Sequence, residues 1–97
     1  MYRTGDRRRC GPITVIAADG ERDTLSIGFV VGKRVGSAVE RNRAKRRLRE
    51  AASRSTLKRD TVYVLVAERG VLTANFDSLV GWISAGAASL RPIKEKL

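Results

Sequence analysis

Residues 33–49 read KRVGSAVERNRAKRRLR, and this basic stretch decides both the fold and the chemistry of the chain. Six of the nine residues from Arg41 to Arg49 are Lys or Arg, and this run contains no proline or glycine. A block of like charge this dense usually belongs to a disordered tail. The flanking residues are instead typical of an ordered helix, which predicts a rigid cationic surface.

The start and the buried side of this helix can be predicted from the residues. Ser37 is a suitable N-cap, and Glu40 three residues later completes a capping box. The helix is expected to end near residues 53–54. At about 100° per residue, one stripe of small or apolar side chains should pack inward. This stripe contains Ala44, Leu48, Ala51 and Ala52.

The cations of the helix fall outside that stripe. Residues 33–54 hold nine Lys or Arg and two Glu, so they supply +7 of the net charge of +10. Pairs such as Glu40–Arg43 and Arg46–Glu50 can neutralise only a minority of these charges. Guanidinium groups match phosphate oxygens, so the unpaired cations predict a phosphate-binding surface. The rows are Arg41, Lys45 and Arg49, then Asn42 and Arg46, then Arg43 and Arg47.

Three further apolar segments predict strands. Residues 13–18 (ITVIAA) and 25–31 (LSIGFVV) are separated by a turn-forming cluster at 19–23, and this spacing favours an antiparallel hairpin. Residues 62–67 (VYVLVA) are apolar throughout, which suits a strand covered on both faces in a parallel βαβ unit. A second helix is predicted from the helical spacing of Phe76, Leu79, Val80 and Ile83.

The predicted order is therefore ββαβα in a single polyanion-binding domain over residues 1–97. Its fold class is α+β, a two-layer sandwich with a small sheet and one βαβ crossover. Residues 1–10 are interpreted as an N-terminal arm and residues 91–97 as a frayed tail.

Composition narrows the classes of partner and of chemistry. A balance of 20 Lys and Arg against 10 Asp and Glu attracts polyanions, either nucleic acid or an anionic membrane. No apolar stretch approaches the ~20 residues that span a bilayer, and the first ten residues lack the apolar segment of a secretory signal. A cytoplasmic protein is expected.

Catalytic and metal-binding residues are scarce. Cys10 is the only cysteine and histidine is absent, which excludes a disulfide framework and a Cys/His zinc site. The carboxylates are scattered, and residues 28–33 (GFVVGK) lack the spacing of a phosphate-binding loop. The protein itself is expected to do no chemistry.

Residues 33–51 (KRVGSAVERNRAKRRLREA) closely resemble the protein subunit of bacterial ribonuclease P. The specific part is the triplet Arg41-Asn42-Arg43, followed by Lys45-Arg46 and Arg49 and preceded by the segment GFVVGKRVG. The resemblance is strong over residues 24–52. In the later strand and the final helix it is limited to the pattern of apolar residues.

The resemblance implies a subunit that binds a catalytic RNA, in an endoribonuclease that removes the 5′ leader of precursor tRNA. It implies Mg²⁺ held mainly by the RNA, no obligate protein partner and no membrane. The family's crossover is the rare left-handed one of the ribosomal protein S5 domain 2-like fold, against the usual right-handed preference. The residues implied to face the catalytic RNA are Lys33, Arg34, Arg41, Asn42, Arg43, Lys45, Arg46 and Arg49.

The N-terminus departs from the family. Family members carry a first helix with two aromatic residues that line a cleft for the leader. Here only residues 2–5 (YRTG) resemble the end of that helix, so a truncated first helix is expected. The cationic cluster of Arg3 and residues 7–9 is compatible either with a floppy arm or with a second RNA contact. The leader contacts implied are Tyr2, Arg9, Thr14 and Ile16.

Two other functions compete with this interpretation. The same sandwich and basic helix could serve a ribosomal or general RNA-binding protein. A DNA-binding helix in a major groove is disfavoured, because the helix lies inside a βαβ unit and not in a helix-turn-helix.

Overall fold

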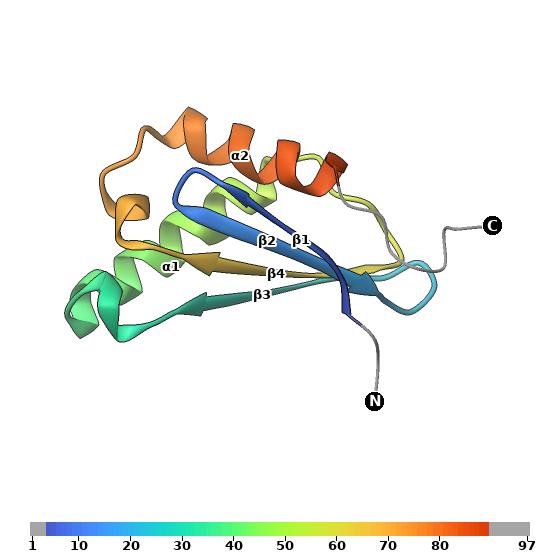
Figure 1. Ribbon diagram of the computed structural model, residues 1–97, viewed down its shortest axis with the longest axis horizontal. Helices are drawn as coiled ribbons and strands as arrows, with labels where there is room; N and C mark the ends of the chain where they lie inside the picture. Colours follow the sequence, from blue (N-terminus) through green and yellow to red (C-terminus); the bar gives the residue numbers. More distant parts are fainter. Residues whose placement is uncertain (1–3, 90–97) are drawn as a thin grey trace.

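A computed structural model describes residues 4–89 of the chain (Figure 1). These residues form one four-stranded sheet, two helices and two short 3-10 turns. The elements are β1 (Thr4–Cys10), β2 (Ile13–Asp19), β3 (Leu25–Val31), η1 (Lys33–Val35), α1 (Ala38–Ser53), β4 (Thr61–Ala67), η2 (Arg69–Leu72) and α2 (Phe76–Ser89).

The strand order in the sheet is β1-β2-β4-β3. β1 and β4 are both antiparallel to β2, whereas β3 and β4 are parallel and joined through α1. In Figure 1 the chain leaves β3, passes behind the sheet as α1 and returns as β4, so the crossover is left-handed. This is the handedness that the family resemblance implies.

The predicted hairpin between residues 13–18 and 25–31 is wrong. β4 lies between β2 and β3, and the hairpin partner of β2 is β1. Gly11 makes the tight turn possible, since its φ of +58° is one that residues with a Cβ rarely adopt. The segment interpreted as an arm is thus a strand from Thr4 onward, and the order is βββαβα.

The same finding corrects the expectation for the N-terminal helix. Thr4 and Gly5, which were matched to the end of a family helix, belong to β1. Tyr2 and the tail at 91–97 lie outside the described residues.

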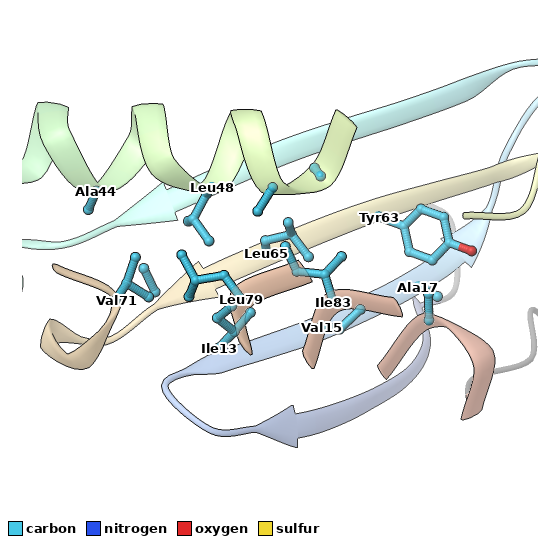
Figure 2. Packing of buried hydrophobic residues seen from close by; sticks show 14 of the residues in the cluster. Ile13, Val15, Ala17, Ala44, Leu48, Tyr63, Leu65, Val71, Leu79 and Ile83 are labelled. Atoms are coloured by element: carbon cyan, nitrogen blue, oxygen red, sulfur yellow. The ribbon is translucent and has the colours of Figure 1, made fainter. Parts of the chain in front are cut away.

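Both helices pack on one face of the sheet and enclose the core (Figure 2). Tyr63 and Leu65 of β4 are buried against this layer, together with Leu48 of α1 and Leu79 and Ile83 of α2. Along β4 buried residues alternate with half-buried ones, so the strand is covered on one face only. The expectation of cover on both faces is wrong, because no helix among residues 4–89 packs on the second face.

Neither helix of the described part, residues 4–89, is long and apolar enough to span a membrane. The fold therefore presents two distinct surfaces, the outer side of α1 and the uncovered face of the sheet.

Candidate nucleic-acid interface

The N-terminus of α1 has the capping box that the sequence predicts. The backbone N–H of Glu40 donates to Ser37 Oγ at 3.2 Å, and the N–H of Ser37 donates to Glu40 Oε1 at 2.9 Å. The predicted inner stripe is buried in full, with Ala44 and Leu48 at 0% exposure. The register of the cationic rows on α1 is thereby confirmed.

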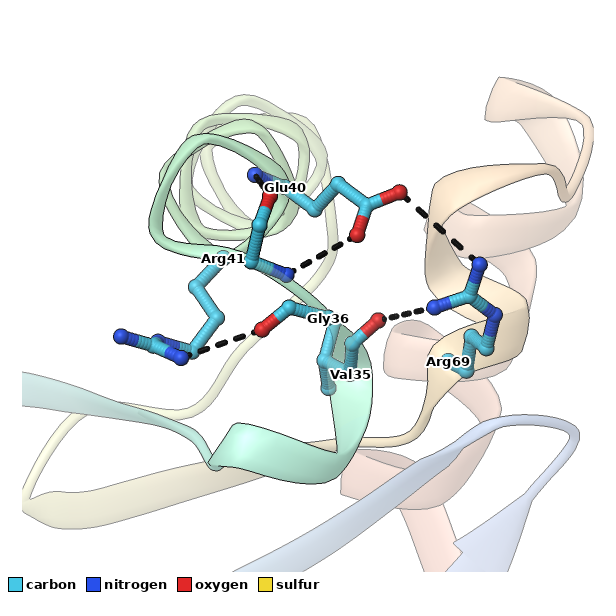
Figure 3. A network of polar contacts seen from close by, with 6 residues as sticks. Val35, Gly36, Glu40, Arg41 and Arg69 are labelled. Carbon is cyan, nitrogen blue, oxygen red and sulfur yellow. Dashed lines mark hydrogen bonds and ion pairs between the residues drawn. The ribbon is translucent and has the colours of Figure 1, made fainter.

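Two arginines hold the segment that precedes α1 (Figure 3). Arg41 Nη1 donates to the carbonyl of Gly36 at 3.0 Å, and Arg69 Nη1 donates to the carbonyl of Val35 at 2.7 Å. The Val35 side chain is buried in the core, which holds η1 against the rest of the fold. Successive carbonyls are thus held from α1 and from η2, so the basic residues at 33–34 have a defined position.

Glu40 joins this network on its other side. Its Oε2 lies 3.8 Å from Arg69 Nη2, while Oε1 accepts from the backbone of Ser37. The Ser37 backbone hydrogen bond, with help from the charges of Arg69 and Arg43, lowers the pKa of Glu40 below its usual 4.5, although partial burial opposes this. Gly36 suits the position beside it, because its φ is +149°, a conformation that residues with a Cβ rarely adopt, and a Cβ there would also clash with the Glu40 side chain.

The lowered pKa of Glu40 predicts a pH dependence of stability. The folded-state pKa is below the unfolded value, so the stabilisation by Glu40 is complete above about pH 4.5 and is lost as the pH falls through the folded-state pKa. Glu40→Gln keeps an N3 acceptor for the capping box but removes the charge. We expect this variant to have a lower Tm than the wild type at pH 7, and the difference in Tm to shrink as the pH falls below about 4.5, as measured by thermal melts. A constant difference in Tm would contradict the assignment.

Most of the cations implied to face RNA are exposed and unpaired within residues 4–89. Glu50 pairs with Arg54 at 3.0 Å and Glu40 with Arg69, so the expected pairs Glu40–Arg43 and Arg46–Glu50 are wrong. Arg41 is half-buried by its bond to Gly36. Of the implied set, Lys33, Arg34, Asn42, Arg43, Lys45, Arg46 and Arg49 are exposed.

Arg49 is the one exposed member with a partner among the described residues 4–89. Its guanidinium carbon lies 5.6 Å from the centre of the Phe29 ring, in a cation–π contact. This contact orients the cation at the end of the row. The exposed set accordingly places cations on η1 and along the outer side of α1.

Arg47 has a different role from its neighbours on α1. Its Nη1 donates to the carbonyl of Val71 and its Nη2 to that of Ala74, each at 2.6 Å. The side chain is half-buried and ties α1 to η2 and to the segment that follows η2. A position within a dense run of cations therefore does not by itself show that an arginine binds phosphate.

This role predicts that alanine substitutions at the adjacent Arg46 and Arg47 differ in their effect on stability. Arg47→Ala should lower the free energy of unfolding by about 1–3 kcal/mol, because two carbonyls lose a charged donor. Arg46→Ala, with the same change of charge on the exposed side, should leave stability within about 0.5 kcal/mol. Urea titrations of the two variants measure the difference. Equal stabilities would show that the Arg47 clamp is absent in solution.

The structure places three of the four implied leader residues, Arg9, Thr14 and Ile16, on the uncovered face of the sheet. The fourth, Tyr2, lies outside the described residues. Arg9 is paired with Thr14 across β1 and β2, and Arg7 with Ile16. Paired residues in a sheet share a face, so the side chains of these two pairs lie on the side opposite the helices. Thr14 and Ile16 are half-buried, and Arg9 makes an ion pair with Glu68 at 2.8 Å.

Two residues at these surfaces, Arg69 and Val39, were missed from the sequence, and Arg7 was named only as part of a cationic cluster and not placed on the sheet. Arg69 lies 20 residues beyond the basic run at the start of η2, and no local pattern connects it with η1. Val39 is an exposed apolar residue among cations, 70% accessible. Arg7 shares the face of Ile16, which period-2 alternation would have shown had residues 4–10 been recognised as a strand.

Comparison with known proteins gives one family. A family model described as Ribonuclease P matches residues 1–88. The ribonuclease P protein component of Bartonella quintana (strain Toulouse) is 38% identical over 93 residues, covering 84% of this chain and 69% of that protein. The component of Dehalococcoides mccartyi (strain CBDB1) is 37% identical over 90 residues, covering 89% and 75%.

Solved structures agree on the fold. The RNase P protein from Thermotoga maritima superposes with a TM-score of 0.75 at 19% identity, covering 86% of this chain and 81% of that one. The Staphylococcus aureus RNase P protein gives 0.68 at 21% identity, with coverage of 84% and 77%. The family match over residues 1–88, together with these relatives, shows that the chain belongs to the ribonuclease P protein family, the protein components of the tRNA-processing ribonuclease P.

Proposed function

We propose that the outer side of α1, together with η1, binds the catalytic RNA of ribonuclease P, and that the uncovered sheet face guides the 5′ leader of precursor tRNA. A ribonuclease P protein component works with the ribonuclease P RNA, so the question is which surface each RNA occupies. The family membership favours this function over a ribosomal or DNA-binding role.

The proposal that α1 binds the catalytic RNA rests on unpaired cations that a rigid helix holds in place. Arg43, Lys45 and Arg46 make no ion pair within residues 4–89, although each is exposed on a helix anchored by its capping box. Like charges held together destabilise a free helix, and the phosphates of a bound RNA would relieve that repulsion. A fixed spacing of guanidinium groups also favours a folded RNA of matching shape over a flexible polyanion.

The second half is supported by the chemistry of the uncovered sheet face. Thr14 and Ile16 of β2 lie beside Val64 and Val66 of β4, which are half-buried, so the floor of this face is largely apolar. Arg7 borders it on β1. Apolar floors with a cationic rim suit single-stranded nucleic acid, whose bases are free to contact side chains and whose phosphates need neutralising.

Magnesium belongs to the RNA in this proposal. No group of three Asp, Glu, Cys or His side chains within residues 4–89 is placed to hold a metal ion. We therefore assign no protein ligand to Mg²⁺, which would supply the hydrolytic chemistry from the RNA. The part of this chain is to bind and orient, in the cytoplasm where tRNA is processed.

The direct test is reconstituted cleavage of precursor tRNA by the cognate catalytic RNA at low magnesium, with and without this protein. We expect the protein to raise the cleavage rate, because its cations offset phosphate repulsion that magnesium otherwise screens. No stimulation at any protein concentration would rule out the proposed function.

A leader-specific comparison separates the two surfaces. Thr14→Glu places a negative charge on the uncovered face and should weaken binding of a substrate with a long leader. The same variant should bind the catalytic RNA as the wild type does, and Arg22→Glu in the loop between β2 and β3 is the control. Equal loss for long and one-nucleotide leaders would contradict the leader assignment.

A further inference from the structure

A shallow hollow lies on the outer side of α1. It has a volume of about 400 Å³ and is lined by Val39, Asn42, Arg43 and Arg46. These positions follow the i, i+3, i+4, i+7 spacing of one helix ridge. Leu48 of the buried stripe comes nine residues after Val39, about 2.5 turns, so the hollow points directly away from the core.

Val39 is the unusual member of this ridge. It is 70% exposed, whereas Leu25 and Val30, the other large exposed apolar residues within the described part of the chain, are 39% and 48% exposed. Single exposed valines are common, and a β-branched residue is a poorer helix former than alanine. This one, however, lies in a hollow whose other three side chains are polar and have no hydrogen-bond partner within residues 4–89.

The four side chains offer three kinds of contact within one small space. Arg43 and Arg46 can each donate in bidentate fashion to a phosphate. The amide of Asn42 has both a donor and an acceptor for a base edge. Val39 provides an apolar surface between them. An occupant with an anionic backbone, a hydrogen-bonding edge and an apolar face satisfies all three.

Paired RNA does not meet these requirements. In an A-form duplex the bases are stacked, and side chains cannot enter the deep, narrow major groove. The wide, shallow minor groove of a duplex presents 2′-hydroxyls and base edges, but no base face that could pack on Val39. An unpaired nucleotide exposes both its base face and its base edge next to its own phosphates.

We propose that this hollow receives one unpaired nucleotide of the catalytic RNA. Its base packs on Val39, its edge contacts Asn42, and the flanking phosphates contact Arg43 and Arg46. The inference rests on the proposed function, since it names what the outer side of α1 recognises in that RNA. It also explains an apolar side chain at the centre of a phosphate-binding surface.

The first test is the salt dependence of binding to the catalytic RNA for single variants. Val39→Ala should weaken binding about 3- to 10-fold at every salt concentration, because no cation is removed and the slope of log K against log salt stays unchanged. Arg46→Ala should weaken binding and reduce the slope by about 0.7–0.9. Leu25→Ala, an exposed apolar truncation at the far end of β3, should have no effect on affinity.

The second test is chemical probing of the RNA with and without protein. Wild-type protein should protect a nucleotide that is reactive, and hence unpaired, in the free RNA. Val39→Ala should restore that reactivity even when the RNA is saturated with protein. The variant should fold normally, since Val39 is exposed and alanine favours the helix.

The outcomes distinguish this inference from the proposed function. If Val39→Ala binds as tightly as the wild type while Arg46→Ala is weakened, the surface contacts phosphates alone and the nucleotide site is wrong. Protection confined to paired nucleotides would also overturn it. If the wild-type protein does not bind the catalytic RNA, the proposed function fails and this site fails with it.

Discussion

Replacing Arg43 and Arg46 together by alanine is expected to weaken binding to the catalytic RNA by more than tenfold at moderate salt. Both guanidinium groups are exposed and without an ion-pair partner within residues 4–89, so their loss costs the fold little. Each charge-assisted contact to phosphate contributes about 1–2 kcal/mol, and about 1.4 kcal/mol is a factor of ten in affinity. The slope of log K against log salt should fall by about 1.4–1.8 for two lost phosphate contacts.

The control for this variant is a cation far from the interface. Arg22 is exposed in the loop between β2 and β3, at the opposite end of β3 from η1. Arg22→Ala changes the net charge by one unit and should alter affinity less than twofold. If removing Arg22 lowers the affinity as much per charge as removing Arg43 and Arg46, the effect follows net charge alone. Binding would then be a long-range attraction without a defined site.

Two glycines of α2 are expected to respond in opposite ways to alanine. A Cβ at Gly86 would lie 2.7 Å from Val15 Cγ2 and 3.1 Å from Val15 Cβ, in the buried contact between α2 and β2. Val15 is β-branched and fully buried, so it cannot rotate away cheaply. We expect Gly86→Ala to destabilise the protein by about 1–3 kcal/mol through overpacking.

Gly81 is the matched control in the same helix. A Cβ there meets no atom within 4 Å, and the position is exposed. Gly81→Ala should therefore stabilise the protein by up to about 1 kcal/mol, the difference in helix propensity between the two residues. Urea denaturation of both variants gives the comparison. Stabilisation of the same size at both positions would mean that α2 does not pack as closely on β2 as described.

The helix α1 could be predicted nearly in full because its determinants are local. Ser37 and Glu40 lie within one turn of each other, and Leu48 and its neighbours repeat at the helical period. The exposure of the outer cations follows from that register alone. The α+β class and the parallel β3–α1–β4 unit were also confirmed.

The sheet order could not be predicted because its determinants are not local. β1 contains Arg7, Arg8 and Arg9 in succession, so it lacks the alternation of apolar residues that identifies a strand. It is a strand because its backbone pairs with β2 at the edge of the sheet. Because the sequence does not predict β1 as a strand, β3 becomes the predicted hairpin partner of β2. The wrong hairpin between residues 13–18 and 25–31 results from this omission.

The polar network at η1 escaped prediction for a similar reason. Arg69 reaches Val35 across 34 positions of sequence, and Arg47 reaches η2 and the residues that follow it across 24 or more. In the sequence, Arg47 falls in the same row as the exposed Arg43, so the helical register alone does not show that it binds carbonyls. Only the packing of η2 against α1 separates a cation that stabilises the fold from a cation that is free to bind RNA.

The central claim, that the outer side of α1 lies against the catalytic RNA, is tested most directly by hydroxyl radicals from a probe tethered to that surface. Lys45→Cys and Arg22→Cys, each in a Cys10→Ser background, place the probe on α1 and in the β2–β3 loop. We expect strand breaks confined to a few neighbouring segments of the RNA from position 45 and few or none from position 22. Strong breaks from position 22, with none from position 45, would contradict the account.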